Sequence, residues 1–424
     1  MPAGGGAGAG AGADGGDAGR KALVVGGSLA GLSAANWLTA AGWRVEILER
    51  SRQPLEDRGA GIVLHPSTSR FLTEQQGSAL DDFSLGVDHL RYVGPSGDVV
   101  AESASRLRFG AYGALYRSLR RSLEERGGAY VHGAHVTGAG ADAGGAVVEL
   151  ADGSRRTADL VVGADGVRST VRRAVLPAIE PVVAGYVAWR GVFPEDELPP
   201  GVREPLARAI TYTILDHGHI LTYPIRTATG EVQRNWVWYR NLPSPDDLDE
   251  LLRDRDGERH DLSVPAGAVR QEQLDELQAA AAATLPPPVA KLVRATAEPF
   301  VQVMVDVDPP KVAFGRICLV GDAGFVARPH AAAGTAKGAE EAWLLAQTVA
   351  DPAIDVPAAL ATWELAVLPI GSALVARSRR AGERAQYEGT WEVGEPLPFG
   401  LRAAGDSEYG PEGAAAGHTR PGSG

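Results

Sequence analysis

The alternation of apolar and polar residues predicts a strand, turn, helix and strand near the start of the chain. Residues 22–25 (ALVV) are a short apolar run, and Gly26–Gly31 (GGSLAG) is a glycine-rich turn that opens an alanine-rich helical segment. Gly42 ends the predicted helix, and residues 44–48 alternate into a second strand that ends at Glu49. This order of elements is typical of a dinucleotide-binding βαβ unit.

This first motif predicts how a dinucleotide would be held. Gly26 permits the tight turn, the helix N-terminus offers free N–H groups to a pyrophosphate, and Gly31 lets helix and strand pack closely. Glu49 can accept hydrogen bonds from ribose hydroxyls. Ser28 stands where the motif usually has its middle glycine, and an ordinary strand–helix turn is the alternative. The predicted binding residues here are Gly26, Gly27, Ser28, Leu29, Ala30, Gly31, Glu49 and Arg50.

A second polar motif follows an apolar strand in residues 159–170 (DLVVGADGVRST). The strand leads into Asp165-Gly166, and a helix is predicted to start near Ser169. Asp165 would then lie at the carboxyl edge of a strand, where open α/β sheets bind ligands. The alternative is a turn-forming aspartate with no ligand.

A third motif lies in residues 316–342. A buried strand at 317–320 ends at Gly321-Asp322, and a Pro/Gly-rich turn leads to a long helix from about Gly334. An acid at a strand end followed by a helix N-terminus suits cofactor hydroxyls and developing negative charge.

Residues 186–240 change to short, aromatic-rich alternating runs, which predict a separate antiparallel sheet. Its strands are expected at 186–192, 210–215, 219–225 and 234–240. Further helices are expected at 71–80, 116–125, 246–255, 271–283, 289–294 and within 365–376, with a hairpin at 90–102 and strands at 130–136, 146–150 and 300–307. The fold class is α/β.

Composition and charge narrow the function. The chain has 424 residues and a net charge of −12, which disfavours nucleic acid as a partner, and no basic run suggests a membrane surface. Cys318 is the single cysteine and lies in an apolar run, so we expect a buried thiol, no disulfides and a cytoplasmic location. The apolar stretch 365–376 falls short of the roughly 20 residues of a membrane span. No metal site is expected.

The three motifs together resemble the class A flavoprotein monooxygenases, of which para-hydroxybenzoate hydroxylase is a familiar member. The resemblance covers roughly residues 21–385 and is strongest to the 2,6-dihydroxypyridine 3-monooxygenase branch, which also has a serine at the position of Ser28. The segments that carry it are GGSLAGL in the turn, GAGIVL at 59–64, AGYVAWRGV at 184–192, DHGHILTYPI at 216–225 and GDAGFVARPHAAAGTAKGAEEA at 321–342.

The resemblance implies FAD as the cofactor, with the first motif on its ADP half. Asp165-Gly166 would serve FAD and NAD(P)H use, Gly321-Asp322 the ribityl chain, and the helix beginning at Gly334-Thr335 the flavin pyrimidine. Arg117 is the best match to an arginine that commonly contacts FAD. Three features depart from the family pattern: the usual G-x-G-x-N run is here Gly334-Thr335-Ala336 without the asparagine, Glu341 replaces an aspartate, and Val367 replaces an arginine.

The implied fold is a Rossmann-like FAD-binding domain of the flavoprotein hydroxylase type with an inserted antiparallel-sheet substrate domain. We expect a disordered tail at 1–19, the first part of the FAD-binding domain at 20–180 with some substrate-site loops at 59–115, and the substrate sheet at 181–299. The second part of the FAD-binding domain would span 300–385, and a largely disordered segment 386–424.

The implied reaction is reduction of FAD by NADH or NADPH, addition of O₂ at flavin C4a, and oxygen transfer from the hydroperoxide to an electron-rich aromatic ring. A base near neutral pKa should stand beside the substrate, and His330 is the first candidate. His219 and Tyr223 share one face of a strand and could line the pocket, and His65 is weaker. Trp189, Trp236 and Trp238 could cover the substrate or belong to the core.

The ring itself is left open. The branch favours a 2,6-dihydroxypyridine-like compound, and a phenolic natural-product intermediate is the alternative. A flavin halogenase is less favoured, because Trp236-Val237-Trp238 is followed by Tyr-Arg-Asn instead of the halogenase ending. A Baeyer–Villiger enzyme would need a second glycine-loop unit, and a non-catalytic FAD-binding protein is a further alternative. A homodimer is possible.

Overall fold

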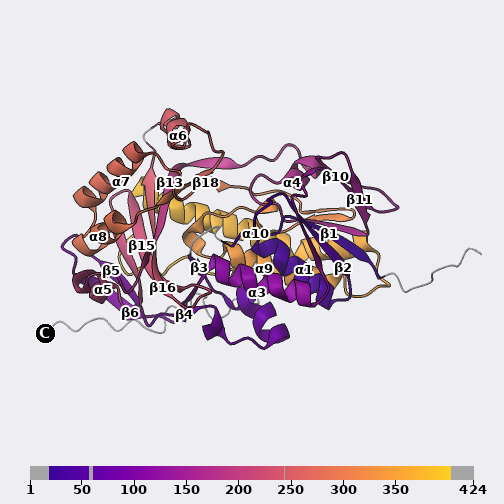
Figure 1. Cartoon of the computed structure of the whole chain (residues 1–424), viewed down its shortest axis with the longest axis horizontal. Coiled ribbons are helices and arrows are strands. Elements are labelled where there is room, and N and C mark those ends of the chain that lie inside the picture. Colours follow the sequence, from indigo (N-terminus) through magenta and orange to yellow (C-terminus); the bar gives the residue numbers. More distant parts are fainter. Residues whose placement is uncertain (1–18, 57–60, 243, 403–424) are drawn as a thin grey trace, which may run out of the picture.

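The computed structural model describes residues 19–56, 61–242 and 244–402. Two sheets lie side by side, a mostly parallel one with its helices and a larger mixed one with its own helical layer (Figure 1). The expected N-terminal tail before Gly19, residues 59–60 of the segment 59–64, and the end of the chain after Arg402 lie outside the described residues.

The first motif folds as its pattern predicts. Strand β1 (Lys21–Val25), helix α1 (Leu29–Ala40) and strand β2 (Arg44–Glu49) form a parallel βαβ unit. Strand β2 also carries the polar residues Arg44 and Glu46, whereas most residues of β1 are buried and apolar because helices and a small antiparallel sheet cover the faces of this sheet. Its order is β19-β20-β12-β1-β2-β8, with β8 (Ala129–His132), β12 (Leu160–Gly163), β19 (Ala313–Phe314) and β20 (Ile317–Leu319).

Four helices pack about this sheet and each other. Helix α1 contacts α3 (Tyr112–Glu125) and α9 (Gly334–Thr348), and α9 contacts α10 (Val356–Glu383). Small residues allow the close approach, since a Cβ on Gly338 would lie 3.0 Å from the Cβ of Ala30. The small sheet comprises β9 (Val136–Ala141), β10 (Ala146–Leu150) and β11 (Arg155–Ala158), and α4 (Thr170–Val175) packs on β9.

The large sheet contains all four predicted aromatic-rich strands, and confirms them as antiparallel neighbours. They are β13 (Val182–Pro194), β14 (Ala209–Leu215), β15 (Gly218–Arg226) and β16 (Val232–Asn241). The predicted hairpin also joins it. The other members are β3 (Gly61–Val63), β4 (Leu85–Gly86), β5 (His89–Val93), β6 (Val99–Ala104), β7 (Arg108–Ala111), β17 (Ser263–Val264) and β18 (Phe300–Asp306).

The two faces of the large sheet have different environments. Trp189, Trp236 and Trp238 point to the face covered by helices and belong to a buried apolar cluster with residues of α5, α7 and α8. The proposal that these tryptophans cover the substrate is therefore wrong, and their core alternative is confirmed. The covering helices are α5 (Pro200–Leu206), α7 (Gln271–Thr284) and α8 (Pro287–Ala295).

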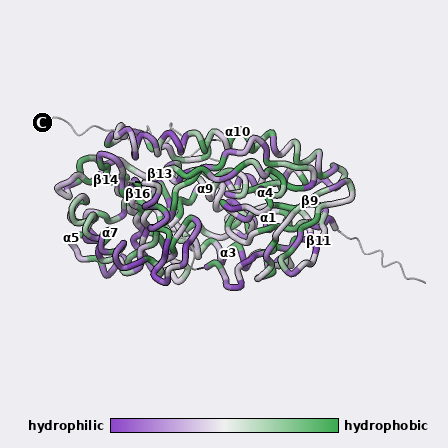
Figure 2. Tube along the Cα trace, turned by 90° about the horizontal axis from the view of Figure 1, so that it is seen from above, coloured by the Kyte–Doolittle hydropathy of each residue, from purple (hydrophilic) through white to green (hydrophobic). Residues whose placement is uncertain are grey.

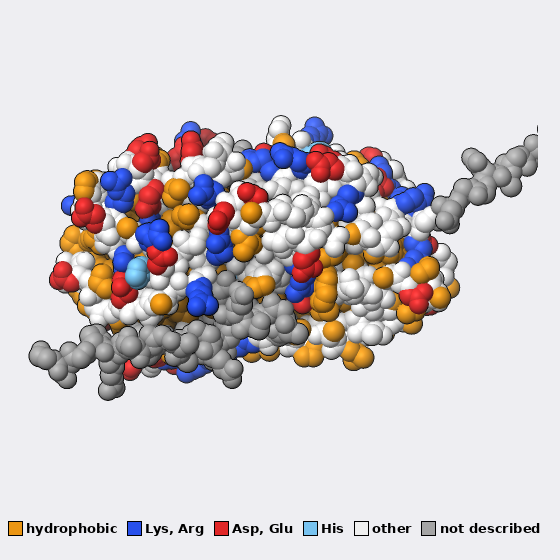
Figure 3. All heavy atoms as spheres, turned by 90° about the horizontal axis from the view of Figure 1, so that it is seen from below, with side chains coloured by type: hydrophobic (Ala, Val, Ile, Leu, Met, Phe, Trp, Pro, Cys, Tyr) orange, Lys and Arg blue, Asp and Glu red, His pale blue; other side chains and the backbone are white. Residues whose placement is uncertain are grey.

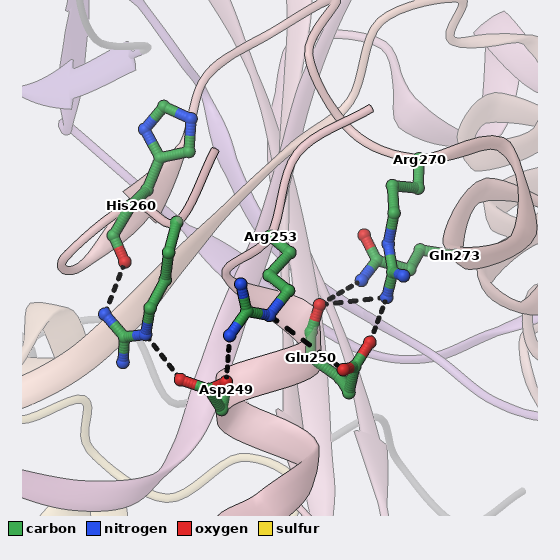
Figure 4. A network of polar contacts seen from close by, with 7 residues as sticks. Asp249, Glu250, Arg253, His260, Arg270 and Gln273 are labelled. Atoms are coloured by element: carbon green, nitrogen blue, oxygen red, sulfur yellow. Dashed lines mark hydrogen bonds and ion pairs between the residues drawn. The ribbon is translucent and has the colours of Figure 1, made fainter. Parts of the chain in front are cut away.

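Short helix α6 (Pro245–Leu251) is tied to α7 by polar contacts at the outer surface (Figure 4). Asp249 pairs with Arg253 and Arg259, while Arg270 and Gln273 both donate to the backbone oxygen of Glu250. Because these groups are largely exposed, the network mainly orients α6 and adds little stability.

Helix α10 runs along both halves of the molecule (Figure 2). Together with its π-helical continuation η5 (Arg384–Glu388), α10 is the one helix in the described residues whose length and composition would allow it to cross a membrane. A core helix passes the same test, and Trp363, Leu374 and Val375 are buried against the protein.

Lys, Arg, Asp and Glu side chains intermingle on the coloured part of the face seen in Figure 3.

Two predicted elements differ from the structure because glycines with positive φ interrupt them. The expected helix 71–80 is instead α2 (Pro66–Arg70), a π turn η1 (Phe71–Gln75) and a 3₁₀ turn η2 (Leu80–Asp82), with Gly77 at φ 68° between the turns. The expected strand 130–136 is split into β8 and β9 at Gly133, whose φ is 73°.

Candidate active site

A cavity of about 410 Å³ lies between the two sheets and gathers residues from all three predicted motifs. One end is lined by the first turn of α1, by Gly166, and by the starts of η3 (Gly321–Ala323) and α9. The other end is lined by the uncovered face of the large sheet. Eleven predicted site residues line this single cavity: Ser28, Leu29, Ala30, Gly166, His219, Tyr223, Gly321, Asp322, His330, Gly334 and Thr335.

The glycine turn holds the first motif close to the neighbouring strand end. Gly26 has φ 99°, and a Cβ there would lie 2.4 Å from the backbone oxygen of Ala164. Gly27 donates its N–H to Glu49 Oε2 at 2.9 Å, so the carboxylate is buried at the end of β2 beside the turn. A hydrogen bond of 2.9 Å joins the hydroxyls of Ser28 and Tyr112, which turns the serine side chain away from helix capping.

Two helix N-termini face this cavity without a capping side chain. Helix α1 begins after Ser28 and helix α9 after Ala333, and neither carries an acidic residue in its first turn. Their N-terminal N–H groups and positive dipole ends therefore suit an anion or a group that gains negative charge. An FAD pyrophosphate at α1 and a flavin ring at α9 fit this arrangement.

Asp322 presents its carboxylate to the cavity. Its side chain is open to the cavity but surrounded by protein, and the carboxylate accepts no hydrogen bond from the described residues. Burial raises the pKa of Asp322, and the charges of Lys337 and Arg172 oppose the rise. The hydroxyls of a ribityl chain are the kind of donors that such a carboxylate lacks.

A buried ion pair fixes the turn that carries Asp322. Glu341 accepts the N–H of Gly321 at 2.7 Å, and Lys337 donates to the oxygen of Gly321 at 2.7 Å while lying 3.5 Å from Glu341. The glutamate that departs from the family pattern thus holds the backbone of the Gly-Asp motif.

Asp165 caps a helix. Its carboxylate accepts from the hydroxyl of Ser169 and from the backbone N–H groups of Thr170 at 2.6 Å and Val171 at 3.2 Å, at the start of α4. This is the turn-forming role that the sequence left open, while the adjoining Gly166 lines the cavity. Buried Arg172 donates to the oxygen of Ala323 at 2.9 Å and so ties the second motif to the third.

His330 lies in the turn η4 (Pro329–Ala331), as predicted, and lines the sheet end of the cavity. Its Nε2 is 2.6 Å from the hydroxyl of Tyr186, and its Nδ1 is buried without a hydrogen-bond partner among the described residues. Burial and the charge of Arg328 lower the pKa of His330 to about 3. The expectation of a near-neutral pKa is therefore wrong, because the sequence does not reveal burial.

His219 and Tyr223 project from β15 into the same cavity, as expected for residues four apart on a strand. The rings of His219 and His330 are 5.3 Å apart, and burial, with the His330 charge, lowers the pKa of His219 well below its usual value. Tyr223 donates its hydroxyl to the oxygen of Gly61 at 2.9 Å and stacks on Phe109, so it holds the β3 segment.

Arg190 is the clearest example of a site residue that the sequence did not predict. It lies on β13 and lines the cavity, no ion pair to it is found among the described residues, and its Nε is buried without a partner. Strand alternation could have revealed it, because Arg190 and Ala188 are two residues apart and therefore lie on the face of the strand opposite to its apolar face. Other unpredicted lining residues include Tyr112, Tyr212, Tyr239, Met304, Trp391 and Phe399.

The remaining predicted residues lie outside the cavity lining. The turn and helix α1 contain Gly26, Gly27 and Gly31, which do not line the cavity. Arg50 is exposed just after β2. Arg117 pairs with Glu56 at 2.9 Å, and His65 Nε2 is 2.8 Å from the oxygen of Ala332. Cys318 is buried in β20, as predicted, and burial raises its pKa.

The buried histidines should make stability fall in acid. Because His330 has a pKa of about 3 when folded and histidine has ~6.5 when unfolded, the unfolded chain binds the extra proton below pH ~6.5. Folding then loses up to ~1.4 kcal/mol per pH unit for this residue. Urea unfolding at pH 7.5 and 5.5 should show a smaller loss for His330→Gln than for the wild type. The exposed His135→Gln should behave as wild type, and an equal loss in all three proteins contradicts the assignment.

The chain is similar to known FAD-dependent proteins. A family profile described as "FAD binding domain-like" matches residues 183–306. The chain is 36% identical over 383 residues to 2,6-dihydroxypyridine 3-monooxygenase of Paenarthrobacter nicotinovorans, covering 89% of this chain and 95% of that protein. It is 29% identical over 344 residues to 6-hydroxynicotinate 3-monooxygenase of Pseudomonas fluorescens, covering 76% and 81% of the two chains.

Solved structures show the same fold. The 2,6-dihydroxypyridine-3-hydroxylase from Arthrobacter nicotinovorans superposes with a TM-score of 0.83 at 35% identity, covering 90% of this chain and 96% of that chain. A salicylate hydroxylase substrate complex gives a TM-score of 0.70 at 22% identity, covering 88% and 90%, and supports the fold alone. The chain belongs to the class A FAD-dependent aromatic monooxygenases, the flavoprotein hydroxylases.

Proposed function

We propose that this enzyme hydroxylates a small heteroaromatic ring that binds as an anion, of the 2,6-dihydroxypyridine kind, with O₂ and NADH or NADPH. The observation that carries the proposal is Arg190, which has no ion-pair partner among the described residues and lines the cavity together with Tyr223, Tyr239 and apolar side chains of the large sheet. The similarity to monooxygenases of dihydroxypyridine and hydroxynicotinate supports a hydroxylated nitrogen heterocycle.

FAD, when bound, supplies the electron transfer and oxygen activation of this family. In our proposal the chain holds it along the line of the three motifs. The N-terminus of α1 binds the pyrophosphate, Glu49 the ribose, Asp322 the ribityl hydroxyls, and the N-terminus of α9 the flavin pyrimidine. The other residues that we propose to contact FAD are Arg50, Arg117 and Asp165.

His330 is proposed to orient the ring oxygen of the substrate by a hydrogen bond. Tyr186 is buried and its hydroxyl hydrogen needs an acceptor, which Nε2 of His330 provides at 2.6 Å. Neutral His330 then carries its hydrogen on Nδ1, the nitrogen that has no hydrogen-bond partner in the described part of the chain. A donor at this place stabilises an oxygen that bears negative charge, and so keeps the ring electron-rich.

Arg190 would add a fixed positive charge on the sheet side. Its charge acts on both Tyr223 and Tyr239, where it opposes the effect of burial, which raises the pKa of Tyr239 to about 12. The ring of Tyr239 is 4.7 Å from that of His330, so the cation and the histidine flank one space. An anionic ring between them gains attraction that a neutral ring lacks.

The walls of this space exclude water. Leu221, Val237 and Met304 line it together with the tyrosines, and water exclusion protects a reactive oxygen donor from side reactions.

In the domain division that we propose, residues 20–180 and 300–385 bind FAD and residues 181–299 bind the substrate, with loops of 59–115 contributing. Strand β18, placed at the start of the returning part, pairs with β13 in the large sheet. A cytoplasmic location and a homodimer belong to the same proposal.

Asp322→Asn is expected to weaken FAD binding without unfolding the protein. The carboxylate makes no hydrogen bond to the described residues, so its loss costs the apoprotein little, whereas bonds to ribityl hydroxyls are each worth ~1.5–3 kcal/mol to a charged acceptor. The dissociation constant for FAD should rise at least tenfold. Asp165→Asn should instead lower the free energy of unfolding, because it weakens a helix cap. Equal FAD affinity in Asp322→Asn and the wild type contradicts the assignment.

The proposal is tested by NADH and NADPH oxidation of the FAD-loaded enzyme with a panel of hydroxypyridines, hydroxynicotinate and aminohydroxybenzoate. The last compound is included because the chain is also 29% identical over 370 residues to a 3-amino-4-hydroxybenzoate 2-monooxygenase of Streptomyces platensis. Stimulation greatest with a hydroxypyridine, and a product with one added oxygen, supports the proposal. Stimulation only by phenols contradicts it and favours a phenolic natural-product substrate.

A further inference from the structure

The described chain after α10 forms part of the active-site wall. Residues 389–402, here called the C-terminal strap, follow the π turn η5 and contribute Trp391 and Phe399 to the cavity lining. The sequence of this part, rich in glycine and proline, predicts a place in the largely disordered segment 386–424. Neither residue belongs to the motifs that the FAD assignment uses.

Trp391 lies at the sheet end of the cavity, away from the α1 turn. Its ring is 4.7 Å from that of His219 in an edge-to-face arrangement and 5.8 Å from that of Tyr212. Both partners stand on the cavity face of neighbouring strands β15 and β14. Trp391 therefore borders the space between Arg190 and His330 that we assign to the substrate ring.

The strap is fixed on both sides of this tryptophan. Before it, the N–H of Thr390 donates to the oxygen of Arg384 at 3.1 Å, and after it Glu395 forms a two-bond ion pair with the Arg384 guanidinium at 2.7 Å each. One arginine at the end of α10 thus holds both flanks of Trp391.

The far end of the strap is joined to the His330 turn. The N–H of Gly400 donates to the oxygen of Ala331 at 3.0 Å, and Arg377 donates to the backbone oxygens of Pro398 and Gly400. Phe399 and Leu401 are buried. A segment anchored at two ends and buried at one holds a side chain in place far better than a free tail does.

We propose that Trp391 is a specificity-determining residue, whose indole closes the sheet end of the cavity and restricts the enzyme to single-ring substrates. The inference rests on the proposed function of this site as the place where the aromatic ring binds. A planar ring can pack against the indole, and such aromatic contacts contribute beyond their buried area. A second fused ring would have to occupy the space that the indole fills.

The test compares binding of two probes, 2,6-dihydroxypyridine and 2-hydroxyquinoline, to the FAD-loaded protein by the change in flavin absorbance. Wild type should bind the single ring more tightly. Trp391→Ala should weaken single-ring binding about tenfold and strengthen two-ring binding, so that the ratio of the two constants falls by much more. Trp391→Phe should lie between. Val393→Ala, an exposed position in the same strap, should match the wild type.

Two further outcomes keep this inference separate from the proposed reaction. Glu395→Gln, which breaks the anchor but keeps the indole, should shift the ratio in the same direction by a smaller factor. The binding ratio requires no turnover, so a wild type without hydroxylation contradicts the proposed function and leaves this test intact. A ratio in Trp391→Ala within twofold of wild type, or a wild type that binds neither probe, overturns the role of Trp391.

Discussion

His330→Ala is expected to retain FAD and to lose hydroxylation by about 10²–10³-fold, the usual effect of removing one donor to a developing or fixed oxyanion. His330 lies at the sheet end of the cavity, and its side chain hydrogen-bonds to Tyr186, whereas the proposed FAD contacts come from α1, η3 and α9. The loss should therefore appear in product formed per NADH consumed, with normal flavin absorbance.

Substitution of Tyr186, together with the pH dependence of activity, distinguishes a hydrogen-bond-donor role of His330 from a general-base role. Tyr186→Phe removes the hydroxyl that fixes the hydrogen on Nδ1, and should lower the product yield less than His330→Ala. Because the pKa of His330 is about 3, wild-type activity between pH 6 and 8 should not follow a histidine titration. His135→Ala, at an exposed position, serves as the control. A His330→Ala enzyme with full product yield contradicts the assignment.

Gly31→Ala is expected to yield a protein that does not retain FAD. A Cβ at this position would lie 2.0 Å from the backbone oxygen of Gly26, so the turn and α1 must separate. Overpacking of this kind costs about 1–3 kcal/mol of folding free energy, and it displaces the N–H groups that face the pyrophosphate. The absorbance ratio of flavin to protein after gel filtration measures retention.

The matched control for this change is Gly201→Ala. A Cβ there meets no atom within 4 Å, and the residue has no positive φ, so the same substitution should be neutral. A Gly31→Ala protein that elutes with a full complement of FAD contradicts the account of the turn.

Local patterns correctly predicted the strand, turn and helix that carry each proposed cofactor-binding residue. The turn Gly26–Gly31, the strand-end Asp322 and the start of α9 each depend on short runs of sequence whose strand or helix pattern is strong. Alternation along β15 likewise placed His219 and Tyr223 on one face. These features follow from two-residue and 3.6-residue periodicity, which a single sequence displays directly.

Features that depend on burial and on contacts between distant segments could not be predicted in this way. The lowered pKa of His330 comes from its surroundings, and Arg190 is informative because no described carboxylate pairs with it. Trp391 enters the cavity through anchors formed by Arg384 and Arg377 in α10 and the following turn, while its own segment has the composition of a loop. Asp165 had a motif, yet its carboxylate is used to cap α4.

The most direct test of the central claim is the origin of the oxygen in the product. FAD-loaded enzyme is mixed with NADH, 2,6-dihydroxypyridine and ¹⁸O₂, and the product is identified by mass spectrometry. We expect a hydroxylated ring that carries one ¹⁸O atom, formed in proportion to the NADH consumed. NADH oxidation that yields only hydrogen peroxide, or a product whose new oxygen comes from water, would contradict the central claim.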